Sequence, residues 1–481
     1  MNYIIFMPDE MRAESLACYG NETVKTPYHD QLASEGVRFE QCHVQNTVCS
    51  PSRCCLFSGQ YVHVAGHRTL WNLLKPWEPN LAKYLKDNGY DVRIYGKNDL
   101  FAQATIPIST EEFVNKGRMM PKKLDTKEAQ AAMAKALQGT GKQDFLFPPR
   151  EGDIAAQNDV MNVQAGIDFI QGRKAGDKPF FLFLALSWPH CPYTCFEPYY
   201  SMYMDNIPEL RGRGENKPTY HELIRYYRDL NDQEALKKIQ AVYLGMITFM
   251  DEQLGRVMQT LKDCGLEDET MLIATSDHGD YAGDYGLVEK WPNGMEDVLT
   301  RVPLIIRKPG NKAGHVVREQ VEMFDIMATI MQDAGIEPQH TYFAQSLLPQ
   351  LAGAAGDPDR AVFCEGGYNT NEPHCSEGTL RPSTKGLLAG PSGIYYPKAI
   401  QQHNNPESVC RATMMRTLRR KLVMRTDSTC EFYDLEKDPK ELVNRYDDPA
   451  YQGEIAVMKE RMLMWYINTS DVVPFVEDPR G

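Results

Sequence analysis

The most constraining feature of the 481-residue sequence is an unbroken apolar run over residues 180–186, Phe-Phe-Leu-Phe-Leu-Ala-Leu. A strand with one face in solvent alternates apolar and polar residues, whereas a strand covered on both faces does not. The run therefore predicts a central strand of a sheet with helices on both sides. The following Ser187-Trp188-Pro189 predicts the end of this strand, because proline cannot donate a ladder hydrogen bond.

Further short apolar runs alternate with amphipathic stretches, as in a parallel-rich sheet between helices. The helical spacing of apolar residues from Gln233 to Cys264 predicts one long helix. We expect an α/β fold with a large mixed, mostly parallel sheet flanked by helices. The remaining strands of this sheet are predicted at residues 3–7, 37–44, 92–96, 270–276 and 302–306.

Changes in composition along the chain predict its domain organisation. Residues 1–365 are expected to form a catalytic α/β domain, with an insertion at 101–150 where Pro, Lys, Gln and Gly are mixed. Residues 366–409 are rich in Gly, Asn, Pro and Tyr, and they predict an irregular loop region over a site. Short strand patterns and a final helix pattern predict a smaller α+β subdomain at 410–481.

The composition excludes several classes of protein. A net charge of −13 argues against nucleic-acid binding, which needs a basic excess to neutralise phosphates. No apolar run approaches the ~18 residues needed to span a bilayer, so we expect no membrane association. The N-terminus reads directly as a strand without a signal-peptide pattern, and the cysteines are scattered along the chain. We therefore expect a cytoplasmic protein with reduced thiols.

Acidic residues follow two of the predicted strands. Asp9-Glu10 comes after the first strand, and Asp277-His278 comes after the strand at 270–276. Carboxylates at strand ends are well placed to hold a hard cation, and an imidazole supplies a nitrogen ligand. Alone, the acidic pair would more often be a solvated loop, and Asp277-His278 would equally suit a turn with a surface His.

Cysteine, lysine and histidine candidates lie between these acidic segments. The pentapeptide Cys49-Ser-Pro-Ser-Arg53 opens a helix-like stretch, where free N–H groups favour negative charge. Lys97 and Asp99 follow the strand at 92–96, and His190 follows the central strand as a candidate proton donor. By residue type alone, Cys49 would be a small buried side chain before a turn.

Together these segments resemble type I sulfatases, the formylglycine-dependent sulfatase family of the alkaline phosphatase superfamily. Residues 49–53 are similar to the family's C-x-P-S-R signature, and 89–99 are similar to G-Y-x-T-x-x-x-G-K-x-H. The S-D-H-G at 276–279, the acidic pair at 9–10 and the P-H-x-P at 189–192 resemble further family segments. The resemblance extends from residue 3 to about 445.

The resemblance implies a role for each candidate. Cys49 would be oxidised to formylglycine by a formylglycine-generating enzyme, and Arg53 would hold the modified residue. Lys97 and Lys290 would contact the sulfate group, and His190 would protonate the leaving oxygen. Four positions depart from the family's pattern: Glu10 replaces an Asp, Val92 replaces a Thr, Asp99 replaces the His that helps decompose the intermediate, and Tyr285 stands where a His is frequent. The implied metal ligands are Asp9, Glu10, Cys49, Asp277 and His278.

We therefore expect hydrolysis of small sulfate monoesters with one divalent metal. Ca²⁺ suits an oxygen-rich site, while His278 leaves Mn²⁺ open. The carboxylate of Asp99 keeps open a phosphonate monoester or phosphodiester hydrolase of the same superfamily. Two further hypotheses are a non-catalytic relative and a thiolate hydrolase that uses Cys49 with His190. The sequence leaves room for a homo-oligomer.

Overall fold

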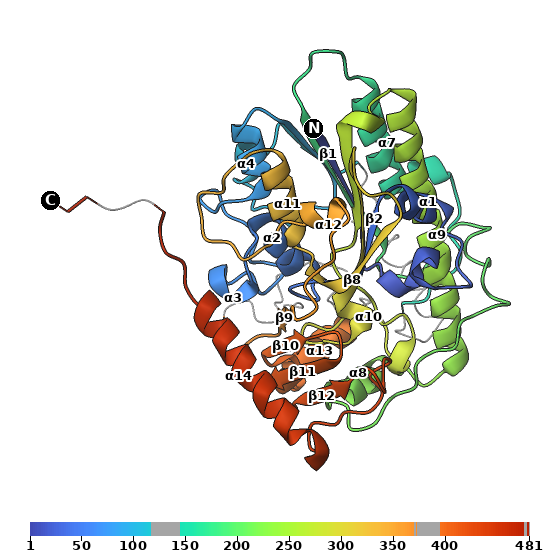
Figure 1. Ribbon diagram of the computed structural model, residues 1–481. Helices are drawn as coiled ribbons and strands as arrows, with labels where there is room; N and C mark the ends of the chain where they lie inside the picture. The colour runs from blue at the N-terminus through green and yellow to red at the C-terminus, as the bar shows by residue number, and fades with distance from the viewer. Residues whose placement is uncertain (117–144, 370–371, 373–394, 476–478, 481) are drawn as a thin grey trace.

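The computed structural model describes residues 1–116, 145–369, 372, 395–475 and 479–480. The predicted insertion at 101–150 and the predicted loop region at 366–409 therefore lie partly outside the described residues. Two sheets form the frame of the molecule, a large one above and a smaller one below (Figure 1).

The large sheet has eight strands in the order β4-β3-β5-β1-β6-β7-β2-β8. Neighbouring strands are parallel except that β7 is antiparallel to both β6 and β2. The predicted α/β fold with a mixed, mostly parallel sheet is confirmed. The strands are β1 Asn2–Asp9, β2 Val37–His43, β3 Asp91–Gly96, β4 Glu112–Val114, β5 Phe180–Pro189, β6 Thr270–Thr275, β7 Arg301–Arg307 and β8 His315–Glu322.

Helices cover both faces of the large sheet, as the apolar run in β5 predicts. Tyr3 and Ile5 of β1 point into a core shared with α2, α4 and α11, while Ile4 and Phe6 point into the opposite core shared with α7 and α9 (Figure 1). This alternation follows from the two-residue period of a strand. The helices are α1 Pro27–Glu35, α2 Cys49–Ser58, α3 Val62–Ala65, α4 Leu81–Asp87, α5 Ile106–Ser109, α7 Asn158–Gln171, α8 Tyr220–Arg228, α9 Gln233–Asp263, α10 Asp297–Thr300, α11 Asp325–Asp333, α12 Leu348–Leu351, α13 Tyr396–Asn404 and α14 Gln452–Thr469.

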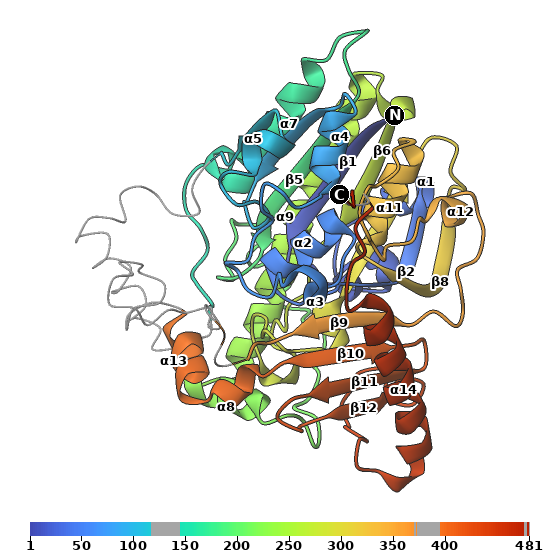
Figure 2. The same ribbon diagram turned by 90° about the vertical axis from the view of Figure 1, so that its left-hand side faces the viewer.

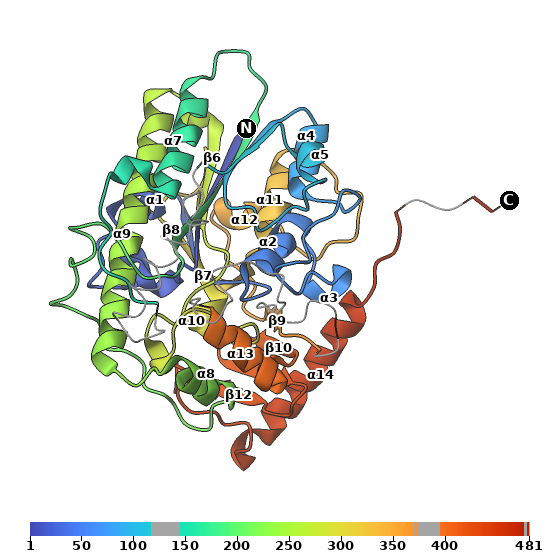
Figure 3. The same cartoon turned by 180° about the vertical axis from the view of Figure 1, so that it is seen from behind.

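The smaller sheet is antiparallel, with the order β12-β11-β10-β9, and α14 packs across it (Figure 2). Its strands are β9 Val362–Gly366, β10 Ala412–Arg416, β11 Arg420–Arg425 and β12 Glu431–Asp434. A smaller C-terminal α+β subdomain is therefore confirmed. Its first strand, β9, spans residue 365, where the sequence patterns place the end of the catalytic domain. On the side opposite α14, α13 lies against α8 (Figure 3).

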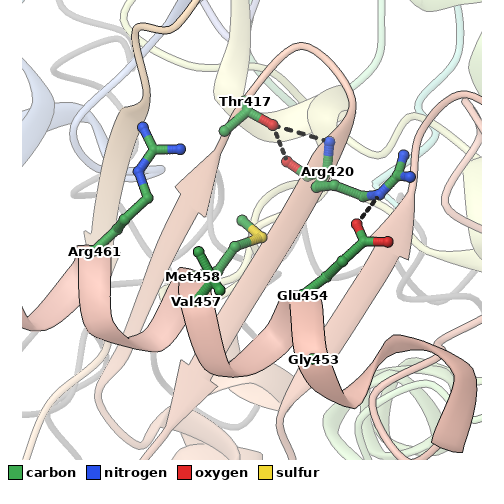
Figure 4. A pocket seen from close by; sticks show the side chains of 7 residues that line it. All are labelled: Thr417, Arg420, Gly453, Glu454, Val457, Met458 and Arg461. Carbon is green, nitrogen blue, oxygen red and sulfur yellow. Dashed lines mark hydrogen bonds and ion pairs between the residues drawn. The ribbon is translucent and has the colours of Figure 1, made fainter.

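A pocket of about 280 Å³ lies on the smaller subdomain, between α14 and the β10–β11 turn. Val457 and Met458 of α14 point towards the strands, and Arg420 and Glu454 form an ion pair at its edge (Figure 4). The residues that resemble sulfatase site residues do not line this pocket. In the described part of the chain, no helix combines the length and apolarity needed to cross a bilayer.

Candidate active site

The candidate residues meet at one edge of the large sheet. Asp9 ends β1 and Asp277 follows β6, the parallel neighbour of β1. Lys97 follows β3 and His190 follows β5, which are parallel to each other and to β1. The carboxyl ends of these strands therefore share an edge, where α/β proteins place their ligands. Cys49, the first residue of α2, completes the group.

Four buried side chains could hold a metal ion. Asp9, Cys49, Asp277 and His278 each offer one ligand atom, and these atoms lie within 4.8 Å of one another. The His278 Nε2 atom is 3.3 Å from Cys49 Sγ and 3.7 Å from Asp9 Oδ1. The Nδ1 atom of His278 donates to the Gly279 carbonyl, which leaves the Nε2 lone pair free for a cation. Two carboxylates and a neutral imidazole suit a divalent cation.

Arg53 and Lys97 compensate the buried carboxylates. The Arg53 Nε atom lies 2.8 Å from Asp277 Oδ2, and its Nη2 atom lies 3.0 Å from Asp9 Oδ2. The Lys97 Nζ atom lies 2.7 Å from the same Asp9 oxygen and 3.6 Å from Cys49 Sγ. Burial opposes ionisation of Asp9, but Lys97 and Arg53 outweigh it and hold its pKa well below the usual range. Arg53 thus ties together the two carboxylates of the candidate metal site.

The Cys49 side chain is a neutral thiol in this environment. Burial and the charge of Asp9 raise its pKa well above that of an ordinary cysteine. The histidine beside its Sγ atom is His278, whereas His190 contacts Lys290 and Glu10. This arrangement disfavours the thiolate hydrolase that pairs Cys49 with His190.

Glu10 lies outside the group of four candidate ligands, although the resemblance implies that it binds the metal. Its Oε1 atom contacts the Lys290 ammonium and lies 3.3 Å from His190 Nε2. The Lys290 Nζ atom lies 3.1 Å from His190 Nε2. Burial opposes the charge of Lys290, but the nearby carboxylates of Glu10, Glu289 and Asp9 raise its pKa well above the usual value, so it is an ammonium. Burial and Lys290 lower the pKa of His190, which keeps its imidazole neutral.

Asp99 joins the site through Lys97. Its Oδ2 atom lies 2.8 Å from Lys97 Nζ, and its side chain is partly exposed. Burial opposes the charge of Lys97, but Asp9 and Asp99 outweigh it and raise its pKa well above the usual value. Lys97 therefore bridges a buried carboxylate and one that reaches solvent.

Two residues that support the site were not among those predicted from the sequence. The buried Asp159 on α7 accepts the N–H groups of Ser187 and Trp188, at 2.8 and 2.9 Å, and so holds the end of β5 before His190. The Ser276 hydroxyl accepts from Met11 N–H and donates to the Pro8 carbonyl, which joins the ends of β1 and β6. Ser276 belongs to the S-D-H-G segment, whereas no local signal points to Asp159.

The chain matches a known protein family over more than half of its length. The family model named Sulfatase matches residues 1–336. The chain belongs to the sulfatase family. This sulfatase is a sulfuric ester hydrolase of the alkaline phosphatase superfamily, which confirms the family that the sequence motifs resemble.

Individual relatives align over most of this sulfatase. It is 26% identical to the multifunctional alkaline phosphatase superfamily protein PehA of Trinickia caryophylli, with 99% of this chain and 96% of that protein covered. It is 28% identical to an arylsulfatase of Clostridium perfringens, with 70% of this chain and 75% of that protein covered. Among solved structures, a phosphonate monoester hydrolase of Agrobacterium radiobacter superposes with a TM-score of 0.74 at 24% identity, with 97% of this chain and 96% of that chain covered.

Proposed function

We propose that this sulfatase hydrolyses sulfate monoesters with a nucleophile made from Cys49 and one divalent metal held by Asp9, Cys49, Asp277 and His278. The observation that carries the proposal is the position of Cys49 at the start of α2, with its Sγ atom 3.5 Å from Asp9 and 3.3 Å from His278. The two carboxylates favour Ca²⁺, and the imidazole also suits Mn²⁺.

The bound metal, the modified Cys49 and the neighbouring charged residues would each have a separate role in the reaction. A bound cation would withdraw electron density from a sulfate oxygen. In modified Cys49 the aldehyde hydrate would supply the attacking oxygen, as the family resemblance implies. The Lys97 ammonium lies beside Cys49, where it would stabilise negative charge. The Lys290 ammonium lies beside His190 Nε2. Asp99 would accept a proton during decomposition of the intermediate, relayed through Lys97.

Phosphonate monoester or phosphodiester hydrolysis is the second candidate. It is favoured by Asp99, which stands where sulfatases usually have His. Rates on matched aryl sulfate, aryl phosphonate and diaryl phosphate esters would rank the activities. A kcat/KM for the sulfate at least about tenfold above the others is expected, which corresponds to about 1.4 kcal/mol of transition-state preference. The reverse order would favour the second candidate.

Mass spectrometry of the Cys49 peptide tests the nucleophile. The protein should be expressed with and without a formylglycine-generating enzyme, the maturation partner that the proposal requires. Conversion of thiol to aldehyde, together with loss of aryl sulfatase activity in Cys49→Ala, is the expected result. Full activity with an unmodified thiol would overturn the formylglycine mechanism. Location in the cytoplasm and assembly into an oligomer stay predictions from sequence.

A further inference from the structure

Lys290 lies between two buried carboxylates. Its Nζ atom contacts Oε1 of Glu10, the neighbour of Asp9 in sequence, and lies 3.6 Å from Glu289 Oε1. Both glutamate side chains are almost wholly buried. In a buried space an ammonium is attracted strongly by each carboxylate nearby. The position of Lys290 therefore depends on how well each of the two carboxylates is paired with other cations.

Two other cations already pair with Glu289. The Lys398 Nζ atom lies 3.0 Å from Glu289 Oε1, and the Arg228 Nη2 atom lies 3.3 Å from Glu289 Oε2. Burial opposes ionisation of Glu289, but Lys398 and the other nearby cations outweigh it and lower its pKa below the ordinary value. Each oxygen of this carboxylate thus has its own cation. At Oε1, Lys398 is the closer of the two ammonium groups and Lys290 is the more distant.

The backbone of Glu289 is held in place. Its φ of 62° lies in the left-handed region, which is uncommon outside glycine and clusters at functional sites. Its N–H donates to the Tyr193 hydroxyl at 2.9 Å, and its carbonyl accepts from the Tyr281 N–H at 3.0 Å. A lysine, in contrast, carries its ammonium on a flexible four-carbon side chain. If the pairing of Glu289 changes, Lys290 is therefore the group that can move.

Two helices outside the large sheet supply the cations that pair with Glu289. Arg228 is the last residue of α8 and Lys398 lies in the first turn of α13, and these helices pack together (Figure 3). The Lys398 Nζ atom also lies 3.4 Å from the Lys290 carbonyl and 5.7 Å from the centre of the Trp291 ring. Helix α13 belongs to the segment 366–409, which the sequence predicts as a loop region over a site. This segment thus places a buried cation next to Lys290.

We propose that Lys398 is a positioning residue, which occupies Glu289 Oε1 and so keeps the Lys290 ammonium in the active site. Without Lys398, Glu289 would be a buried carboxylate with one cation fewer, and the nearest flexible cation would replace it. That cation is Lys290, and its movement would remove positive charge from the sulfate group to which the family resemblance assigns it. The effect on turnover rests on the proposed function, whereas the competition between the two carboxylates does not.

Crystal structures of wild type, Lys398→Met and Lys398→Arg measure this competition directly. In Lys398→Met, the Lys290 Nζ atom should lie within about 3 Å of Glu289 Oε1 and should have left Glu10. In Lys398→Arg, which keeps the cation, Lys290 should stay in contact with Glu10. Lys290 still in contact with Glu10 in Lys398→Met would overturn the inference. This measurement needs no substrate.

The double variant Glu289→Gln/Lys398→Met separates positioning from a merely structural role. Lys398→Met should lose at least about tenfold in kcat/KM on 4-nitrophenyl sulfate, because a displaced cation no longer stabilises the transition state. The second substitution removes the carboxylate that captures Lys290, so the double variant should be more active than Lys398→Met. A double variant that is equally slow or slower would contradict the positioning role. Lys237→Met, at an exposed lysine, is the control and should match wild type.

The two experiments separate failure of the inference from failure of the proposed function. If wild type hydrolyses no sulfate ester, the proposed function fails, while the crystal structures still decide where Lys290 lies. If Lys398→Met does not fold, Lys398→Gln, which can donate hydrogen bonds to Glu289 without a charge, replaces it in both experiments. An unmoved Lys290 together with an unchanged kcat/KM would show that Lys398 only joins α13 to the rest of the protein.

Discussion

Arg53 on α2 forms a wholly buried ion pair with Asp277, with 2.8 Å between Nε and Oδ2. The same guanidinium also pairs with Asp9. Arg53 therefore links α2 to the carboxyl ends of β1 and β6, where the candidate metal ligands lie. The family resemblance assigns Arg53 to the modified cysteine. The structure adds that Arg53 fixes the spacing of two candidate metal ligands.

Arg53→Ala should be strongly destabilising. It leaves Asp9 and Asp277 buried beside each other with less compensating charge, which typically costs about 3–5 kcal/mol in free energy of unfolding. Urea unfolding in the presence of chelator measures this loss. Added Ca²⁺ or Mn²⁺ should recover part of it, because a cation neutralises the same carboxylates. Arg318→Ala, at an exposed position, is the control and should change stability by less than about 0.5 kcal/mol.

Asp99→Asn should alter turnover more than folding. Removing a partly exposed charge 2.8 Å from Lys97 should lower KM for an anionic ester, since one repulsive charge is gone. If Asp99 is the base for the second step, that step should slow about 10²-fold or more. Stopped-flow measurement should then show a burst of phenol followed by a slow steady state. Absence of a burst together with wild-type kcat would exclude Asp99 as the base; the exposed Asp87→Asn is the control.

Asp159→Ala should change the position of His190, although the two residues are not in contact, because Asp159 holds the end of β5. Two buried N–H groups, those of Ser187 and Trp188, would lose their acceptor, at about 1–3 kcal/mol each. The loss of unfolding free energy should come with a lower kcat, because the segment after β5 carries His190. Asp159→Asn keeps one acceptor oxygen and should be milder. Asp168→Ala, on an exposed face of the same helix, should be neutral in both assays.

Stability should fall between pH 5 and pH 8 through Glu322. Burial raises its pKa to about 7 and Asp325 adds to this, against the opposing charge of Arg360. A raised carboxyl pKa means that folding favours the protonated form. Its contribution is therefore fully present below the ordinary value of 4.5 and is lost as the pH rises through about 7. The difference between the ordinary pKa of 4.5 and the folded-state pKa of about 7 corresponds to about 3 kcal/mol in free energy of unfolding.

Glu322→Gln isolates this contribution from those of other groups. The variant has no charge to gain, so its unfolding free energy should vary less between pH 5 and pH 8 than that of wild type. Urea unfolding at pH 5 and at pH 8 measures this difference, and Glu337→Gln, at an exposed position, is the control. A pH dependence identical in Glu322→Gln and wild type would show that Glu322 does not titrate in this range.

The sequence by itself determined the fold class and most of the residues at the site. The apolar runs of β1, β5 and β6 are local signals, because a strand buried on both faces needs an unbroken apolar segment. The motifs around Cys49, Lys97 and Asp277 are also local, and each follows directly from the end of a strand or the start of a helix. For this reason the edge where they meet could be expected before any coordinates.

Tertiary structure decided what local patterns do not encode. The short edge strand β4 and the strand β9 exist through pairing with distant partners, and β9 joins the smaller sheet. Glu10 adjoins the candidate metal ligand Asp9 in sequence, yet its left-handed backbone and its hydrogen bonds to Asp277 and Tyr243 accompany a contact of its carboxylate with Lys290. Asp159 on α7 holds the end of β5, which leads directly into His190. These relationships depend on where a side chain points after packing, and a sequence records only which residue is present.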